Sequence, residues 1–237
     1  RQARQNIIVW DRSLGGIKQA GYTGGEGYQL RSIPPRDGYD PKATVSAPFL
    51  GNLIWGDFEY VGGKGEVPLL SDKENTSSIS HLAKIVASEV TKIINVPVLS
   101  NSERNGLAGC LYNVTVPNID NWRRFGVPPD YGASSIPEIY TDPHIGPKVV
   151  LNLMDGLLAE YAGGPLSHPN YALKYNTLFA SRDPVALDSV AGRQIEKWRK
   201  EQRFPTIART GAHITNAAQR GIGNADPTRI QVRNVGR

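Results

Sequence analysis

The amino-acid sequence predicts an α/β fold with a mostly parallel central sheet flanked by helices. The prediction depends on three short, mostly apolar runs, at residues 93–99, 148–154 and 176–180. Runs of this length suit strands that are covered on both faces, as in parallel sheets. Ligands bind outside the carboxyl ends of strands in open α/β sheets. We therefore expect the trailing ends of these strands to gather Ser100, Asp155 and Ser181 around one crevice.

The N-terminal part predicts a strand, a loop and a short helix. The strand covers residues 6–10, and the helix covers 14–20 and ends at Gly21. Asp11 and Arg12 follow the strand directly. Asp11 has two interpretations, because an aspartate just before a helix is an ordinary cap but also stands where a ligand would bind.

Residues 29–67 are rich in proline, glycine and aromatic side chains, and they predict a β-rich insertion or sheet extension. Three roles for it stay open: it covers a sheet edge, contacts a partner or forms one wall of the crevice. A short helix is predicted after it, over residues 78–86, and leads into the first central strand.

The loop after the first central strand lies at the centre of the predicted fold. Ser100 and Asn101 open this loop, and a helix rich in small residues follows over 106–113 and ends at Asn113. The small side chains allow the helix backbone to approach the sheet closely. Cys110, within this helix, is interpreted as a small core residue.

Residues 117–147 form a proline-rich connection, which we interpret as a lid-like segment over the crevice. The strand after it ends at Asp155-Gly156, the same relative position that Ser100 takes after the first strand. This parallel favours Asp155 over the other acidic residues as part of a ligand site.

The motif SRDPVALD, residues 181–188, predicts the start of a helix. Asp183 suits the N-cap, and Pro184 suits the first helical position, where its missing amide hydrogen costs nothing. Asp188 either favours the helix dipole or points into a site. A helix over 210–220 and an alternating edge strand over 229–235 complete the predicted fold.

The composition fits one folded domain over residues 1–237 and excludes several classes of function. The net charge of +5 is modest, and the densest basic run, 197–203, contains Glu201 and is interpreted as a solvated helix end. The single cysteine excludes an iron–sulfur cluster held by cysteines of this chain alone. No apolar run approaches the ~18 residues that span a bilayer. The chain begins without an initiator Met, which predicts a missing or processed N-terminal portion.

Six segments carry a resemblance to a known family: NIIVWDR, KIINVPVLSNSERNGLAGCLYN, NWRRF, VVLNLMDGLLAEYAGGP, NTLFASRDPVALDSVAG and GIGNADPTRIQV. Together they resemble the bacterial and archaeal family named domain of unknown function 362. The resemblance implies an α/β fold and a further βα portion before residue 6. The similar branch often carries a twin-arginine export signal, which implies an extracytoplasmic location, periplasmic or at the cell surface. The family has no settled activity to transfer, and some members carry iron–sulfur modules that this sequence lacks.

The sequence departs from the family pattern at three places in the predicted crevice. Relatives tend to carry lysine and histidine shortly after the central strand and another lysine before the helix asparagine. Here these places hold Ser100, Ser102 and Tyr112. The substitutions remove the cations that would clamp an anion and the group best suited to acid–base catalysis, which predicts a degenerate crevice.

Two functions from different classes follow. The first is an accessory or structural subunit of a larger extracytoplasmic assembly, with other protein subunits as partners. The second is a small-molecule-binding protein or an enzyme that uses carboxylates at strand ends, with a small anionic ligand or a hard divalent cation. Nucleic-acid binding is set aside, because the sequence offers no basic stripe with stacking aromatics. No catalytic residue, metal or cofactor is assigned. The candidate ligand residues are Asp11, Arg12, Ser100, Asn101, Asn113, Asp155, Asp183 and Asp188.

Overall fold

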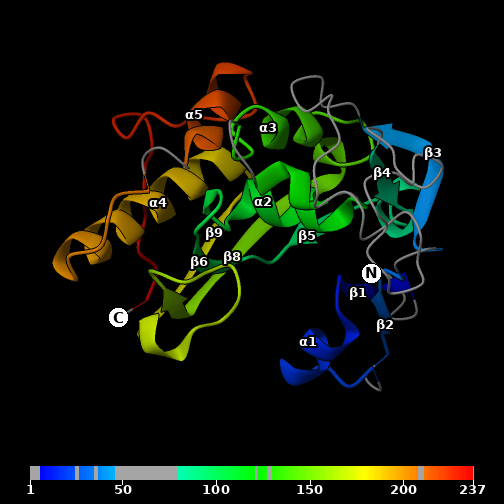
Figure 1. Ribbon diagram of the computed structural model, residues 1–237, viewed down its shortest axis with the longest axis horizontal. Helices are drawn as coiled ribbons and strands as arrows, with labels where there is room; N and C mark the ends of the chain where they lie inside the picture. The colour runs from blue at the N-terminus through cyan, green and yellow to red at the C-terminus, as the bar shows by residue number, and fades with distance from the viewer. Residues whose placement is uncertain are drawn as a thin grey trace, which may run out of the picture. The chain divides into compact units, whose positions relative to one another are not determined.

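The computed structural model describes residues 6–24, 27–34, 37–45, 80–120, 122–126, 130–207 and 211–236. The chain forms two compact units, here called the N-terminal unit (Arg1–Thr91 and Pro117–Arg124) and the C-terminal unit (Lys92–Val116 and Phe125–Arg237). Mixed sheets flanked by helices confirm the predicted α/β class (Figure 1). That the whole chain is a single domain stays a prediction.

The N-terminal unit contains two small sheets. Strand β1 (Ile8–Asp11) pairs in parallel with β2 (Gln29–Ser32), and helix α1 (Leu14–Gln19) lies between them in the chain. This confirms the predicted strand, loop and helix. Strand β3 (Tyr39–Val45) pairs antiparallel with β4 (Ser80–Ala83). The strands β2 and β3 lie within the predicted β-rich insertion, of which residues 46–67 lie outside the described part.

The predicted helix over residues 78–86 is wrong. Its described residues form strand β4 and the start of a single π-helical turn, Ile85–Glu89. Ser80 and Ala83 pair with residues of β3, and Leu82 and Ala83 are fully buried. Pairing with a strand that is distant in sequence has therefore outweighed local helix propensity, as tertiary context often does.

The C-terminal unit is built around a five-stranded sheet. Its strands are β5 (Ile93–Asn95), β6 (Val98–Ser102), β7 (Gly106–Leu107), β8 (Val149–Glu160) and β9 (Ala172–Ser181). Its α-helices are α2 (Cys110–Thr115), α3 (Ser135–Tyr140), α4 (Pro184–Glu201) and α5 (Ala212–Gln219). Turns of 3-10 helix cover Val116–Asn118, Trp122–Gly126, Gly146–Lys148 and Pro169–Tyr171 in the chain as a whole.

The long strand β8 organises this sheet. It pairs in parallel with β5 and β6 and antiparallel with β9, while β6 and β7 form a small antiparallel hairpin. The sheet is therefore mixed rather than mostly parallel. The reason is the short connection between β8 and β9, which contains no crossover helix, and two strands joined in this way run in opposite directions.

This topology overturns the prediction that three strand ends meet at one crevice. Asp155 does not end its strand, because β8 continues to Glu160. In the register of β8, Ser181 lies opposite Asn152, and Ser100 lies opposite Glu160. At ~3.3 Å per residue along a strand, these two positions are separated by roughly 26 Å. Ser100, Asp155 and Ser181 therefore do not line one shared hollow.

One face of the sheet packs against helix α4, which runs diagonally near β8 and β9 in Figure 1. The core there joins Leu99 and Met154 of the strands to Ile195 and Trp198 of the helix. On the opposite face, large apolar side chains stay exposed, including Ile94 at 59% and Leu178 at 58%. The expectation that the central strands are covered on both faces is therefore not met within this unit.

The C-terminal helices follow the prediction closely. Asp183 is the N-cap of α4, where its side chain accepts a hydrogen bond from the amide of Ala186, and Pro184 opens the helix. Helix α5 lies inside the predicted range 210–220. Residues 229–235 form no strand, because no neighbouring strand pairs with them. The connection 117–147 contains α3 and several 3-10 turns, and its role as a lid stays a prediction.

Candidate functional site

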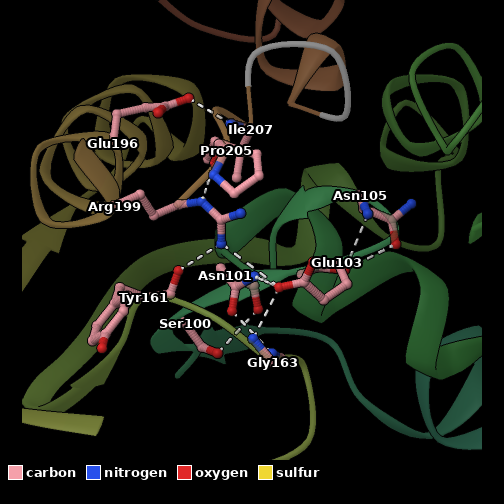
Figure 2. Close-up of polar contacts among 12 residues, drawn as sticks. Ser100, Asn101, Glu103, Asn105, Tyr161, Gly163, Glu196, Arg199, Pro205 and Ile207 are labelled. Atoms are coloured by element: carbon pink, nitrogen blue, oxygen red, sulfur yellow. Dashed lines mark hydrogen bonds and ion pairs between the residues drawn. The ribbon is translucent and has the colours of Figure 1, made fainter. Parts of the chain in front are cut away.

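A hollow of about 420 Å³ lies at the carboxyl end of helix α4. Three segments of the C-terminal unit form it: the turn between β6 and β7, the residues that follow β8, and the end of α4 with the chain beyond it (Figure 2). Its walls are made by Ser102, Glu103, Ala162, Gly163, Tyr171, Arg199, Phe204, Pro205, Thr206 and Ile207.

Arg199 is the buried cation of this hollow. Its side chain is only 5% exposed. Nε donates to the carbonyl of Pro205 at 2.6 Å, and Nη1 donates to the carbonyl of Tyr161 at 2.8 Å (Figure 2). Nη2 makes no hydrogen bond to any residue that the structure describes. The guanidinium is thus fixed by two of its nitrogens, while the third keeps two donors for a ligand.

The helical repeat explains why an arginine is buried at this position. The buried stripe of α4 contains Ala191, Ile195 and Trp198, and Arg199 lies one turn beyond Ile195. Residues four apart share one face of a helix. Sequence reasoning missed Arg199 because it grouped the residue with the exposed run 197–203. The four-residue spacing from the buried Ile195 is the sequence signal that places Arg199 on the buried face of the helix, unlike the lysines near it.

Glu103 is the acidic group beside Arg199. Its Oε1 accepts hydrogen bonds from Asn101 Nδ2 at 2.8 Å and from the amide of Gly163 at 2.9 Å. The same oxygen lies 3.6 Å from Arg199 Nη1, and the side chain is 53% exposed. Partial burial raises the pKa of Glu103, but the two hydrogen bonds and the charge of Arg199 outweigh this, so its pKa is lowered. Glu103 is therefore ionised at neutral pH.

Two of the predicted candidates support this site. Asn101 Oδ1 accepts from the amide of Gly164 at 2.9 Å, and the carbonyl of Gly164 accepts from the amide of Glu103 at 3.0 Å. Ser100 Oγ donates to the carbonyl of Asn101 at 3.0 Å. Ser100 and Asn101 thus hold the turn that carries Glu103 against the segment after β8. Neither residue is among those that line the hollow.

A second hollow of about 500 Å³ adjoins the first and shares Phe204 and Thr206 with it. Its charged residues are Glu196, Lys197, Lys200 and Arg203. The Glu196 carboxylate is already occupied, because Oε1 accepts from the Thr206 hydroxyl and the Ile207 amide at 2.6 and 2.7 Å. The basic run of the sequence therefore borders the candidate site, with cations at its rim.

Arg203 ends helix α4 in a left-handed conformation, with φ of 60°. A side chain there costs about 1 kcal/mol relative to glycine. We expect Arg203→Gly to raise the free energy of unfolding by about 1 kcal/mol in urea titrations. Arg203→Ala is the matched control, because it removes the same charge but keeps Cβ, and it should give no such gain. Equal stability of the two variants would contradict the assignment of strain to this residue.

Asp188 is placed differently from either predicted role. It is fully buried within α4, and its two carboxylate oxygens accept from the amides of Cys110 and Leu111 at 2.6 and 2.9 Å. These amides open helix α2, so Asp188 complements the dipole of a neighbouring helix rather than that of its own. Burial raises the pKa of Asp188 to about 6, against the lowering effect of these two hydrogen bonds.

Asn113 and Asp183 are both engaged in contacts between elements. Asn113 Nδ2 donates to Asn95 Oδ1 at 2.8 Å, in a chain of amides that continues to Asn152. Asp183 caps α4 and also accepts from the amide of Asn224 at 2.9 Å. These contacts give both residues a role in the fold. Their proposed role as ligand residues stays a prediction.

The remaining candidates make local contacts of their own. Asp155 stands in the middle of β8, where its side chain accepts from the amide of Leu157 at 2.8 Å. In the N-terminal unit, Asp11 accepts from the amide of Ser13, and Arg12 donates to the carbonyls of Pro117 and Ile119. None of these three residues lines the hollow.

The described residues contain no group of three or more histidine, cysteine, aspartate or glutamate side chains arranged to hold a metal ion. No helix in the described ranges is long and apolar enough to cross a bilayer. The candidate site is therefore defined by the hydrogen bonds and the opposite charges of Arg199 and Glu103.

Comparison with known proteins identifies the family of this chain. Neither the curated proteins nor the solved structures contain a match to this chain. The family model described as "Domain of unknown function (DUF362)" matches residues 57–193, which is more than half of the chain. The matched range includes the loop that carries Glu103, the whole of strands β8 and β9, and the first half of α4. The chain therefore belongs to the DUF362 family.

Proposed function

We propose that this protein binds a small anionic ligand in the hollow beside Arg199. One observation carries the proposal: a buried guanidinium is held by two of its nitrogens and keeps the third unpartnered among the described residues. Burying a charge is costly unless it is paired, and the one ion pair of Arg199 among the described residues is with Glu103, at 3.6 Å and with a side chain that is 53% exposed. A ligand carboxylate or phosphate would complete the coordination of Arg199.

The position of the unpartnered Nη2 on the Arg199 guanidinium constrains how an anion can bind. Nε and Nη1 are committed to the carbonyls of Pro205 and Tyr161, so the two-nitrogen fork that grips a carboxylate side-on is not free. An anion would instead approach end-on, through Nη2. The centroid of the aromatic ring of Phe204 lies 5.5 Å from the guanidinium carbon, so the cation also contacts an aromatic face.

A titration with acetate and with inorganic phosphate tests the proposal. We expect saturable shifts of the amide resonances of Gly163, Phe204 and Ile207, which surround the hollow. Arg199→Lys keeps the charge but not the geometry, and should weaken binding by about tenfold or more. Arg193→Gln is the control, because Arg193 is an exposed cation of the same helix that does not line the hollow.

Thr206→Phe gives an independent test if Arg199→Lys disturbs the fold. Thr206 is exposed at the border of both hollows, so a large side chain there should obstruct ligand entry without touching the buried core. We expect this variant to stay folded and to lose the saturable shifts. Shifts that do not saturate, or that survive in both variants, would refute a binding site at this hollow.

A second candidate function is that of an accessory subunit in a larger assembly. The observation that favours it is the open face of the central sheet, where Ile94, Val98 and Leu178 are 59%, 49% and 58% exposed. Exposed apolar surface of this kind is typical of protein interfaces. Native mass spectrometry of material from the source organism tests this role, with a partner subunit of the complex as the expected finding and a lone monomer as the contrary one.

An extracytoplasmic location, periplasmic or at the cell surface, belongs to the same proposal. It is supported by the resemblance to the family branch that often carries a twin-arginine export signal. Fractionation of the source organism checks it, and recovery of the protein with cytoplasmic markers would contradict it.

A further inference from the structure

The hollow is lined by two oppositely charged side chains, those of Arg199 and Glu103. Only some of the polar atoms of each side chain make hydrogen bonds to the residues that the structure describes. Arg199 is anchored through Nε and Nη1. Glu103 is anchored through Oε1, which accepts two hydrogen bonds, while Oε2 accepts none from the residues that the structure describes. Among the residues that the structure describes, one cationic nitrogen of Arg199 and one anionic oxygen of Glu103 at this hollow therefore have no partner (Figure 2).

We propose that the ligand is an α-amino acid with an apolar side chain, whose carboxylate binds Arg199 Nη2 and whose ammonium binds Glu103 Oε2. This inference rests on the proposed function and narrows its ligand from an anion to a zwitterion. A simple anion would neutralise Arg199 but would be repelled by the ionised Glu103. A zwitterion satisfies both groups and adds no net charge to the hollow.

The spacing of the two protein charges selects an α-amino acid over one with distant charges. Arg199 Nη1 and Glu103 Oε1 are only 3.6 Å apart, so the guanidinium and the carboxylate are direct neighbours at the hollow. The ammonium and carboxylate of an α-amino acid are attached to one carbon and match this arrangement. In an ω-amino acid such as 6-aminohexanoate, the same groups lie at opposite ends of a flexible chain.

The other walls of the hollow indicate an apolar side chain. Ala162 and Ile207 are buried, and Tyr171 and Phe204 stack edge to face with ring centroids 5.4 Å apart. These groups line the hollow together with Pro205. Pockets that bind small molecules typically combine such apolar walls with a few fixed polar groups, which here are Arg199 and Glu103.

The test compares L-leucine with two analogues that each lack one charge. 4-Methylpentanoate lacks the ammonium, and 3-methylbutylamine lacks the carboxylate. We expect calorimetry or amide-shift titration to show leucine binding about tenfold more tightly than 4-methylpentanoate, since a charge-assisted hydrogen bond is lost in the analogue. The amine and 6-aminohexanoate should bind more weakly still.

Glu103→Gln separates the contribution of the charge from that of the fold. Glutamine keeps an oxygen that accepts from Asn101 and Gly163, so the turn keeps its geometry. We expect leucine to bind about tenfold more weakly in this variant, while 4-methylpentanoate binds more tightly because the repulsion is gone. Glu201→Gln, with the same charge change at an exposed position outside the hollow, should alter neither affinity.

The outcomes distinguish this inference from the proposed function. If 4-methylpentanoate binds as well as leucine and Glu103→Gln affects both alike, the zwitterion assignment fails while anion binding at Arg199 stands. If neither leucine nor any anion gives a saturable response, both fail together. An opposite response of the two ligands to Glu103→Gln supports the assignment.

Discussion

Gly164→Ala is expected to lower the free energy of unfolding by about 3 kcal/mol, because its side chain would overlap a backbone atom. A Cβ at this position would lie 2.0 Å from the carbonyl oxygen of Asn101 and 2.7 Å from Ser100 Oγ. Backbone cannot move aside as a flexible side chain can. Chemical denaturation of the variant and of the parent protein measures the loss.

The same substitution should also disturb the candidate site. Gly164 makes two hydrogen bonds to the turn that carries Glu103. Its amide donates to the side chain of Asn101, and its carbonyl accepts from the amide of Glu103. Moving the segment after β8 away from the turn after β6 would displace Glu103 from Arg199. We therefore expect any ligand response at the hollow to disappear even under conditions where the variant stays folded.

Gly192→Ala is the matched control for Gly164→Ala. Gly192 lies inside helix α4, and a Cβ there would meet only Ile214 Cδ1 at 3.7 Å, an ordinary contact. Alanine favours a helix interior over glycine by about 1 kcal/mol, so this variant should be slightly more stable than the parent. If Gly164→Ala were equally harmless, the close approach between the two segments would not exist as described.

The parts of the fold that local chemistry determines were predictable from the sequence. The start of α4 is the clearest case, because Asp183 and Pro184 specify an N-cap and a first helical position without help from distant residues. The N-terminal strand and α1 follow the same logic, since Ser13 caps that helix locally. In each case the signal and the structure lie within a few residues of each other.

Strand direction and the candidate site depend on long-range contacts that the sequence does not display. An apolar run such as 176–180 predicts a strand but not its direction, and the antiparallel pairing of β9 with β8 moved Ser181 away from Ser100. Glu103 gains its role only from Gly163 and Arg199, which are distant in the chain. The sequence predicts a polar loop and a basic run as separate features. It does not show that these two segments lie next to each other in the fold.

Removal of the Asp188 carboxylate is expected to be the second severe change. Asp188→Ala would leave the amides of Cys110 and Leu111 buried without acceptors, at the point where α2 begins. Each buried donor left unsatisfied costs ~1–3 kcal/mol, and a cavity adds to the loss, so we expect about 3 kcal/mol in total. The measurement is again the free energy of unfolding, compared with that of Asp183→Ala, which removes a cap that is only partly buried.

Asp188→Asn removes the titrating group and keeps the shape and one of the two acceptor oxygens, and its loss of the second hydrogen bond is a cost that does not vary with pH. Burial raises the pKa of Asp188 to about 6 in the folded protein, from an ordinary value of 3.8. Between these values the folded state binds more protons than the unfolded state, so the stability contributed by Asp188 is greatest below pH 4 and is lost as the pH rises through 6. The stability of the parent relative to Asp188→Asn should therefore fall by up to about 3 kcal/mol between pH 4 and pH 7. Other carboxylates titrate in both proteins and cancel in the difference. A difference that is flat over this range, or that grows with pH, would show that the folded state does not hold this carboxylate at a raised pKa.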